Sequence, residues 1–184
     1  MRSRSATPEQ RFNRLYHETS DDVLAYLVRR SRSIEDAADA LAETYAAAWR
    51  KLDSLPEGNR ARLWLFGAAR IELRKAATRT RADDELITRM ANELSAVSGR
   101  QPGTTNPDEA LWSAVSYLSA RDREILALTA WEGLAPREIA TVMGISANAV
   151  RRRLYRARSE LRERLDREQS LQTRPTPAMP HSSS

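Results

Sequence analysis

The stretch from residue 136 to residue 155 limits the possible folds most, because it has the residue pattern of a helix-turn-helix. Apolar or small side chains fall where the two helices must pack against each other: Ile139, Ala140, Ile145 and Val150. Gly144 supplies the permissive turn, and the hydroxyl of Ser146 is placed to cap the second helix. This spacing predicts a helix pair of the kind that binds DNA.

The second of these helices has two distinct faces on a wheel of about 100° per residue. Its predicted buried stripe is Val150, Leu154, Ala157, Leu161 and Leu165. The opposite face carries the residues that we expect to contact DNA: Asn148, Arg151, Arg152, Tyr155, Arg156 and Ser159. From Ala147 to Arg167 there are eight arginines and three carboxylates. The net charge of this segment, +5, equals the formal net charge of the whole chain. Such a face suits phosphates and guanine edges, although an ordinary solvated arginine-rich helix is the alternative.

The overall composition favours a helical protein. Of the 184 residues, 41% are hydrophobic and only six are glycine, which suits helical cores better than sheets. We therefore expect an all-α fold. The chain has no cysteine and two histidines, which excludes disulfides, thiolate chemistry and zinc–cysteine sites, and we expect no metal or cofactor.

Other classes of protein are disfavoured by patterns that the sequence lacks. The N-terminal residues have no apolar core, and no stretch approaches the ~18 apolar residues of a membrane span. We therefore expect a cytoplasmic protein without membrane insertion. The sequence also has no glycine-rich phosphate loop and no nucleophile elbow, which argues against an enzyme.

Charge and composition divide the chain into two domains joined by a tether. Residues 60–81 hold seven basic residues and one acidic residue, whereas residues 82–110 hold six acidic and two basic residues. Helix-breaking residues are dense from 98 to 107. We expect domains at 9–81 and 108–168, an acidic flexible linker at 82–107, and disordered tails at 1–8 and 169–184.

The clearest helix of the first domain begins near Ile34 and ends before Pro56. Its predicted apolar face is Ile34, Ala37, Ala38, Leu41, Tyr45, Ala48 and Leu52. The other face presents three carboxylates in one stripe, from Asp36, Asp39 and Glu43. This acidic stripe is either a solvated face or a docking surface for a basic partner element.

A third helix, from about residue 60 to residue 81, mixes aromatic and basic side chains: Trp64 and Phe66 lie among Arg62, Arg70, Arg74 and Lys75. Bases of single-stranded DNA stack on aromatic rings while cations follow the phosphates. A helix so apolar at its start must also bury much of this face. We favour a core position for the two aromatic residues. Backbone contact is at least as well supported as solvation for Arg70, Arg74 and Lys75.

Over nearly all of the chain except its tails, these features resemble the extracytoplasmic-function group of sigma-70-type bacterial RNA polymerase sigma factors. Residues 118–128, 131–134, 138–140, 143–146 and 150–161 are similar to that family's promoter −35-binding domain. Residues 36–50 are similar to the helix that grips the clamp of the largest polymerase subunit. Residues 64–70 are similar to the −10 recognition helix.

The resemblance implies a sigma-2-like domain of three or four helices and a sigma-4-like helix-turn-helix domain. Its partners would be core RNA polymerase, contacted at the clamp and the flap, and promoter DNA, so that the protein associates with the nucleoid when bound to polymerase. The implied polymerase-binding residues are Asp36, Asp39 and Glu43. The implied −10 residues are Arg62, Trp64, Arg70, Arg74 and Lys75, and the arginine-rich face 148–159 would read the −35 element. Many relatives are held inactive by an anti-sigma factor, which is a further candidate partner.

The chain departs from the family pattern at three places. Ile71 stands where the −10 helix usually has Asn, and its side chain cannot hydrogen-bond a base. Ala42 stands where Gln usually precedes Glu, and residues 147–149 replace the usual Gly-Thr start of the recognition helix. Two other functions stay open on the sequence alone. One is a helix-turn-helix transcriptional regulator that does not act as a sigma subunit, and the other is a protein-binding helical adaptor.

Overall fold

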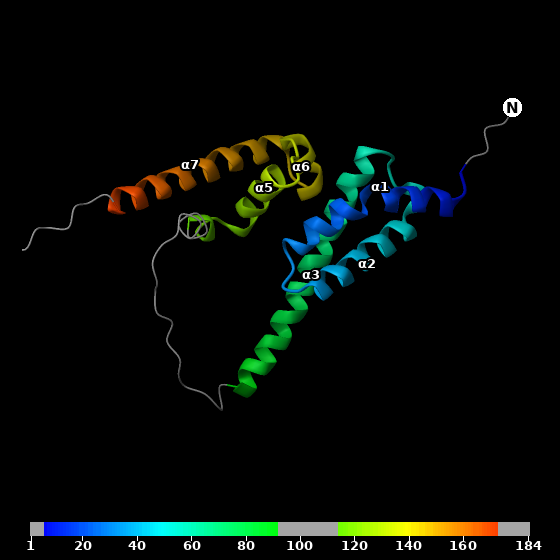
Figure 1. The fold of residues 1–184 in the computed structure, drawn as a ribbon, viewed down its shortest axis with the longest axis horizontal. Coiled ribbons are helices and arrows are strands. Elements are labelled where there is room, and N and C mark those ends of the chain that lie inside the picture. The colour runs from blue at the N-terminus through cyan, green and yellow to red at the C-terminus, as the bar shows by residue number, and fades with distance from the viewer. Residues whose placement is uncertain (1–5, 92–113, 173–184) are drawn as a thin grey trace, which may run out of the picture.

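The computed structural model describes residues 6–91 and 114–172, and all regular structure within these ranges is helical (Figure 1). The N-terminal helices are α1 (Pro8–Val28), α2 (Ile34–Arg50), the short 3-10 helix η1 (Leu52–Ser54) and α3 (Asn59–Ala91). The C-terminal helices are α5 (Ala120–Ala130), α6 (Pro136–Met143) and α7 (Ala147–Gln172). The predicted all-α fold is confirmed.

Polar side chains fix where the first two helices begin. The hydroxyl oxygen of Thr7 accepts a hydrogen bond from the backbone N–H of Gln10 at 3.3 Å, and the Gln10 side chain accepts one from the N–H of Thr7 at 3.0 Å. At the start of α2, the hydroxyl oxygen of Ser33 accepts from the N–H of Asp36 at 3.0 Å. These oxygens satisfy donors that the first turn of a helix leaves unpaired.

The N-terminal helices pack around an apolar core. Its buried side chains are Val23, Tyr26 and Leu27 of α1, Ala37, Ala40, Tyr45 and Ala48 of α2, and Leu63, Leu65, Phe66 and Ala69 of α3. The hydroxyl groups of Thr19 and Tyr45 share a hydrogen bond of 2.7 Å inside this core. Burial raises the pKa of Tyr45 to about 12, so the phenol remains protonated and hydrogen-bonded.

The predicted apolar face of α2 is wrong at two positions. Ile34 and Ala38 are exposed, whereas Ala40 and Thr44 are buried. Thr44 fits the core because its hydroxyl donates to the carbonyl oxygen of Ala40 at 2.6 Å, so this buried hydroxyl has a hydrogen-bond partner. The true buried face of α2 is therefore rotated toward Ala40 and Thr44.

Two helices also extend beyond the predicted boundaries. Residues 82–91, assigned to the linker, form the last ten residues of α3. They contain neither Gly nor Pro, and a change of charge does not by itself end a helix. Residues 169–172, assigned to the C-terminal tail, likewise belong to α7. The remaining linker residues 92–107, residues 1–5 and residues 173–184 lie outside the described residues.

The C-terminal helices form the predicted helix-turn-helix. Gly144 ends α6 with a left-handed φ of 63°, which places the chain for the turn into α7. The hydroxyl oxygen of Ser146 accepts from the N–H of Ala149 at 3.2 Å and caps α7 as expected. α6 lies against α3, so the two groups of helices are in direct contact. None of the described helices is long and apolar enough to cross a membrane.

Candidate nucleic-acid interface

The arginine-rich face of α7 points to solvent because the opposite face of the same helix is packed against other helices. Val150, Leu154 and Ala157 are buried against the other C-terminal helices, as the helical period predicts. Tyr155 consequently points outward and is 77% exposed. Four neighbouring side chains line one shallow depression in this surface: Arg151, Arg152, Tyr155 and Arg156. Four of the six predicted −35 residues are therefore brought together on one accessible surface.

Hydrogen bonds already organise part of this face. Arg151 donates from Nη1 to Oδ1 of Asn148 at 2.6 Å, so the carboxamide is engaged with its neighbour and steadies the guanidinium. Ser159, which is partly buried, donates to Oε1 of Glu163 at 3.3 Å. The exposed cations remain well placed to reach phosphates or guanine edges from one side of a helix.

The predicted −10 residues on α3 fall into two groups. Trp64 is partly buried and packs against the core, and Arg62 is tied to Oδ2 of Asp22 by an ion pair of 2.7 Å. Arg70 is also partly buried. Arg74 and Lys75 are exposed, and Lys75 pairs with Glu72 at 2.9 Å. These residues therefore follow one helix, but they do not form one uniform surface.

Phe66 and Ile71 of α3 lie in opposite environments, one buried and one exposed. Phe66 is fully buried, with its ring 5.3 Å from that of Tyr26, and the guanidinium of Arg62 stands 4.9 Å from the Phe66 ring centre. The preference for a core position is confirmed for Phe66. Ile71 is 51% exposed, so an apolar side chain lies on the surface beside Arg70.

The acidic stripe of α2 is accessible. Asp36, Asp39 and Glu43 are exposed, and within the described residues none of their carboxylates takes part in an ion pair. The stripe borders the buried face of α2 at Ala40 but its own three side chains are exposed. Its negative charge is therefore available to a basic partner.

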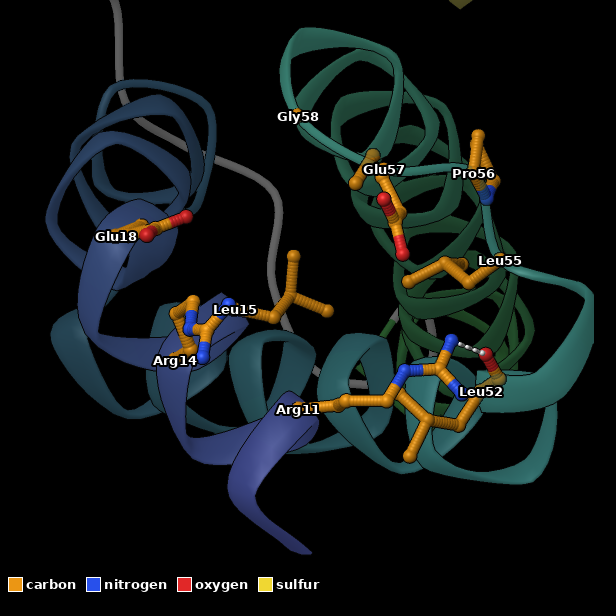
Figure 2. Close-up of a pocket in the computed structure, with 10 residues that line it drawn as sticks. Arg11, Arg14, Leu15, Glu18, Leu52, Leu55, Pro56, Glu57 and Gly58 are labelled. Carbon is orange, nitrogen blue, oxygen red and sulfur yellow. Dashed lines mark hydrogen bonds between the residues drawn. The ribbon is translucent and has the colours of Figure 1, made fainter. Parts of the chain in front are cut away.

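A pocket of about 270 Å³ lies between α1 and the segment that leads into α3 (Figure 2). Arg11, Arg14 and Glu18 line it from α1, and Arg11 donates from Nη2 to the carbonyl oxygen of Leu52 at 3.1 Å. None of the predicted site residues lines this pocket.

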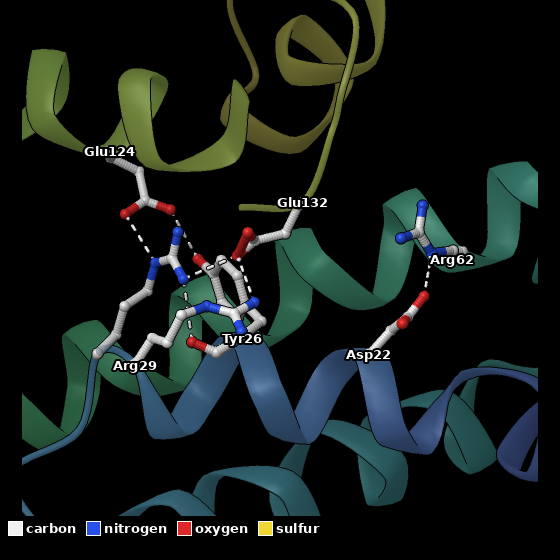
Figure 3. A network of polar contacts seen from close by, with 7 residues as sticks. Asp22, Tyr26, Arg29, Arg62, Glu124 and Glu132 are labelled. Carbon is white, nitrogen blue, oxygen red and sulfur yellow. Dashed lines mark hydrogen bonds and ion pairs between the residues drawn. The ribbon is translucent and has the colours of Figure 1, made fainter. Parts of the chain in front are cut away.

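A group of charged residues between the two sets of helices was not predicted (Figure 3). Arg30, just after α1, donates from Nε to Oε2 of Glu124 at 3.0 Å and from Nη1 to Oε1 of Glu132 at 2.9 Å. The hydroxyl of Tyr26 donates to Oε1 of Glu124 at 2.9 Å, across 98 positions of sequence. We call Tyr26, Arg30, Glu124 and Glu132 the interdomain cluster. No periodic pattern could have revealed it, because arginines at a helix end are equally typical of a solvated C-terminus.

The comparisons with known proteins relate this chain to bacterial sigma factors. Residues 108–161 match the protein family described as "Sigma-70, region 4". The chain is 33% identical over 144 residues to the RNA polymerase sigma factor CnrH of Cupriavidus metallidurans, covering 71% of this chain and 74% of that protein. It is 27% identical over 158 residues to the ECF RNA polymerase sigma factor SigL of Mycobacterium tuberculosis, covering 80% of this chain and 85% of that protein.

The fold is also found among solved structures. The sigma factor RpoE, solved in complex with the anti-sigma factor NepR from Bartonella quintana, has a TM-score of 0.58 to this chain at 24% identity, covering 84% of this chain and 96% of that one. The similarities to CnrH and SigL span most of the chain, which does not favour a regulator that shares only the C-terminal helix-turn-helix. The chain belongs to the extracytoplasmic-function group of bacterial RNA polymerase sigma factors.

Proposed function

We propose that this protein binds core RNA polymerase and directs it to promoters through separate contacts with the −10 and −35 elements. In this role the protein catalyses no reaction of its own, because the polymerase carries out the chemistry. The N-terminal helices, with residues 9–81 as their domain, dock on the polymerase and hold the −10 strand. The helices within 108–168 read the −35 element.

The observation that carries this proposal is the presence of two exposed surfaces of opposite charge. Asp36, Asp39 and Glu43 on α2 form an acidic surface that suits basic residues of the polymerase clamp. Arg151, Arg152 and Arg156 on α7 form a basic surface that suits the DNA major groove. One chain therefore offers a protein-binding surface and a DNA-binding surface on different helices.

The −10 contact is assigned to α3. Arg74 and Lys75 are exposed cations for the backbone of the opened strand, and the partly buried Arg62, Trp64 and Arg70 lie nearer the start of the same helix. Because the exposed Ile71 has no hydrogen-bonding group, we attribute strand binding here to phosphate contacts and stacking. An anti-sigma factor, of the kind seen with RpoE, is a further proposed partner.

Run-off transcription with purified core polymerase and a genomic library tests the proposal. We expect discrete promoter-specific transcripts when the protein is added and none with core polymerase alone. The Asp39→Lys/Glu43→Lys variant serves as a matched negative control. Failure of the unmodified protein to produce any specific transcript across the library would refute the proposed function.

A further inference from the structure

Asn148 and Arg151 are joined by a hydrogen bond near the start of α7. Nη1 of Arg151 donates to Oδ1 of Asn148 at 2.6 Å, and both side chains are exposed. Residues three positions apart on a helix are neighbours on its surface, so the contact fits a regular helical backbone. Ala147 and Ala149 flank Asn148, and neither side chain has a polar group that competes for the carboxamide. The guanidinium of Arg151 is therefore held from within its own helix.

The two arginines that follow Arg151 are placed differently. Arg153 is turned toward α5, where its Nη1 donates to Oδ1 of Asp122 at 2.9 Å. Arg152 is exposed like Arg151, and it forms no ion pair with any residue that the structure describes. Arg151 is thus exposed, as Arg152 is, and held by a side-chain partner, as Arg153 is. Reading a base requires both properties, because the fork must be accessible and correctly oriented.

A guanidinium can keep one partner in its own helix and still read a base. It carries five N–H donors in a rigid planar fork, and arginine commonly binds guanine by donating to O6 and N7 in the major groove. The bond to Asn148 uses one donor on Nη1, which leaves the Nε and Nη2 donors of Arg151 for this bidentate contact. Residues near the N-terminus of a recognition helix are those that contact base edges. Arg151 therefore has the donors and the position to read guanine.

Asn148 is itself a candidate base reader, because asparagine can bind adenine through N6 and N7. That contact requires Oδ1 to accept from N6 while the side-chain NH2 donates to N7. Oδ1 of Asn148 already accepts a charge-assisted hydrogen bond from Arg151, and such bonds are roughly twice as strong as neutral ones. Turning the carboxamide toward adenine would break this bond and release Arg151. The geometry therefore favours guanine over adenine as the base that this pair selects.

We propose that Asn148 is a positioning residue, which holds the Arg151 guanidinium so that Arg151 reads one guanine of the −35 element while Asn148 itself reads no base. This inference rests on the proposed function, because the pair lies on the surface assigned to the −35 element. It adds to that function the identity of one selected base and a division of labour between two of the predicted contact residues.

Holding Arg151 before it meets DNA reduces what binding costs. A long flexible side chain loses conformational freedom when an interface immobilises it, and a side chain that is already held loses less. For one such side chain this difference corresponds to about a three- to tenfold change in the dissociation constant. The hydrogen bond also sets the direction of the fork. Its removal should therefore weaken the preference for guanine as well as the affinity.

Binding of promoter DNA by the polymerase complex tests this role. The probe is a promoter duplex recovered in the run-off assay, with each base pair of its −35 element replaced in turn. Arg151→Ala should lose discrimination at one guanine, which identifies the base pair that Arg151 reads. Asn148→Ala should bind the parent duplex about three- to tenfold more weakly and lose preference at that same base pair. Asn148→Asp keeps an acceptor for Arg151 and should restore the preference.

Two results of this assay would overturn the inference. One is an unchanged guanine preference in Asn148→Ala, and the other is a loss of preference at a different base pair, which would make Asn148 a base reader. The double variant Asn148→Ala/Arg151→Ala gives an independent check. If Asn148 acts only through Arg151, the double variant should bind like Arg151→Ala alone. Losses that add would show that Asn148 contacts DNA independently.

Nuclear magnetic resonance of the free protein measures the positioning without polymerase or DNA. The Nε–H signal of Arg151, identified by its absence from Arg151→Ala, should report restricted motion in the parent and in Asn148→Asp. It should become mobile in Asn148→Ala, whereas the signal of the exposed Arg158 should not change. A mobile Arg151 in the parent would overturn the positioning role. If the parent protein gave no promoter-specific transcript, the proposed function and the guanine assignment would fail together, and this signal would still decide whether Asn148 holds Arg151.

Discussion

Arg153 turns away from the arginine-rich face of its own helix and donates from Nη1 to Oδ1 of Asp122 on α5 at 2.9 Å. Asp122 also accepts a hydrogen bond from the backbone-capping residue Ser119. Partial burial acts to raise the pKa of Asp122, but the hydrogen bonds from Ser119 and Arg153 outweigh it and hold the pKa below its usual value of 3.8. The pair thus joins the recognition helix to its support through an ionised carboxylate.

We expect Asp122→Asn to lower the free energy of unfolding by about 1–2 kcal/mol near neutral pH. Because the folded pKa lies below the unfolded one, the stabilisation is complete above the usual value of 3.8 and is lost as the pH falls through the folded pKa. Urea unfolding of both proteins, from neutral pH down to about pH 3, should show their difference shrinking in acid. A difference that stayed constant would argue against ionised Asp122 as its source.

Replacing Arg151 or Arg152 with Ala should weaken −35 recognition by the polymerase complex. We expect a loss of about 1–3 kcal/mol that depends on the sequence if the side chain reads a base, and a more uniform loss if it binds phosphate. Binding to promoter duplexes with substituted −35 elements measures both cases. Arg158→Ala, an exposed arginine of α7 outside the predicted set, is the matched control. Unchanged binding by both substituted proteins would remove these arginines from the site.

The double charge reversal Asp39→Lys/Glu43→Lys should abolish binding to core polymerase. Both residues are exposed on α2, so the fold should remain intact by circular dichroism and thermal unfolding. Co-purification with polymerase measures the effect. A control reversal of two exposed acids on α1, Glu18→Lys/Asp21→Lys, carries the same charge change and should still co-purify. Normal recovery of the α2 variant would show that the acidic stripe is not the docking surface.

Gly144→Ala should destabilise the helix-turn-helix by about 1–2 kcal/mol, because an alanine must adopt the left-handed backbone. Gly144 has φ of 63° and open space around its Cβ direction, so the cost comes from the backbone and not from a clash. Gly67→Ala, inside α3, is the comparison and should leave stability unchanged or raise it by up to about 1 kcal/mol. Equal stability of Gly144→Ala and the parent in urea unfolding would contradict this account of the turn.

Local features of this fold could be predicted from the sequence. The turn at Gly144, the cap at Ser146 and the faces of α7 depend on residues a few positions apart. The structure confirms the turn and the cap. It buries Val150, Leu154 and Ala157 of the predicted stripe, whereas Leu161 and Leu165, near the end of α7, are only partly buried. The helical period of α7 does not show which of its arginines contacts a residue far away in the sequence. Arg153 looks like its neighbours in the sequence, although in the structure it contacts Asp122 on α5.

Features that depend on distant contacts could not be predicted. The burial of Thr44 depends on a hydroxyl bond inside α2, and the exposure of Ile34 depends on where α2 meets the other helices. The change of charge near residue 82 predicts the end of α3 there, but the helix continues to Ala91. Arg30 and Glu132 are 102 positions apart, so only the packing of the two groups brings them together. The roles of the polymerase and promoter residues stay predictions.

The C-terminal helices face the rest of the protein through α5 and α6 and face solvent through the arginines of α7. Substitutions that alter which promoter is read can therefore accumulate at Arg151, Arg152 or Tyr155 without touching Glu124, Glu132 or Val142. Gene duplicates of such a protein can diverge in target sequence while keeping the same packing against the N-terminal helices. Separating these two surfaces on one small domain makes DNA recognition and domain packing independently evolvable.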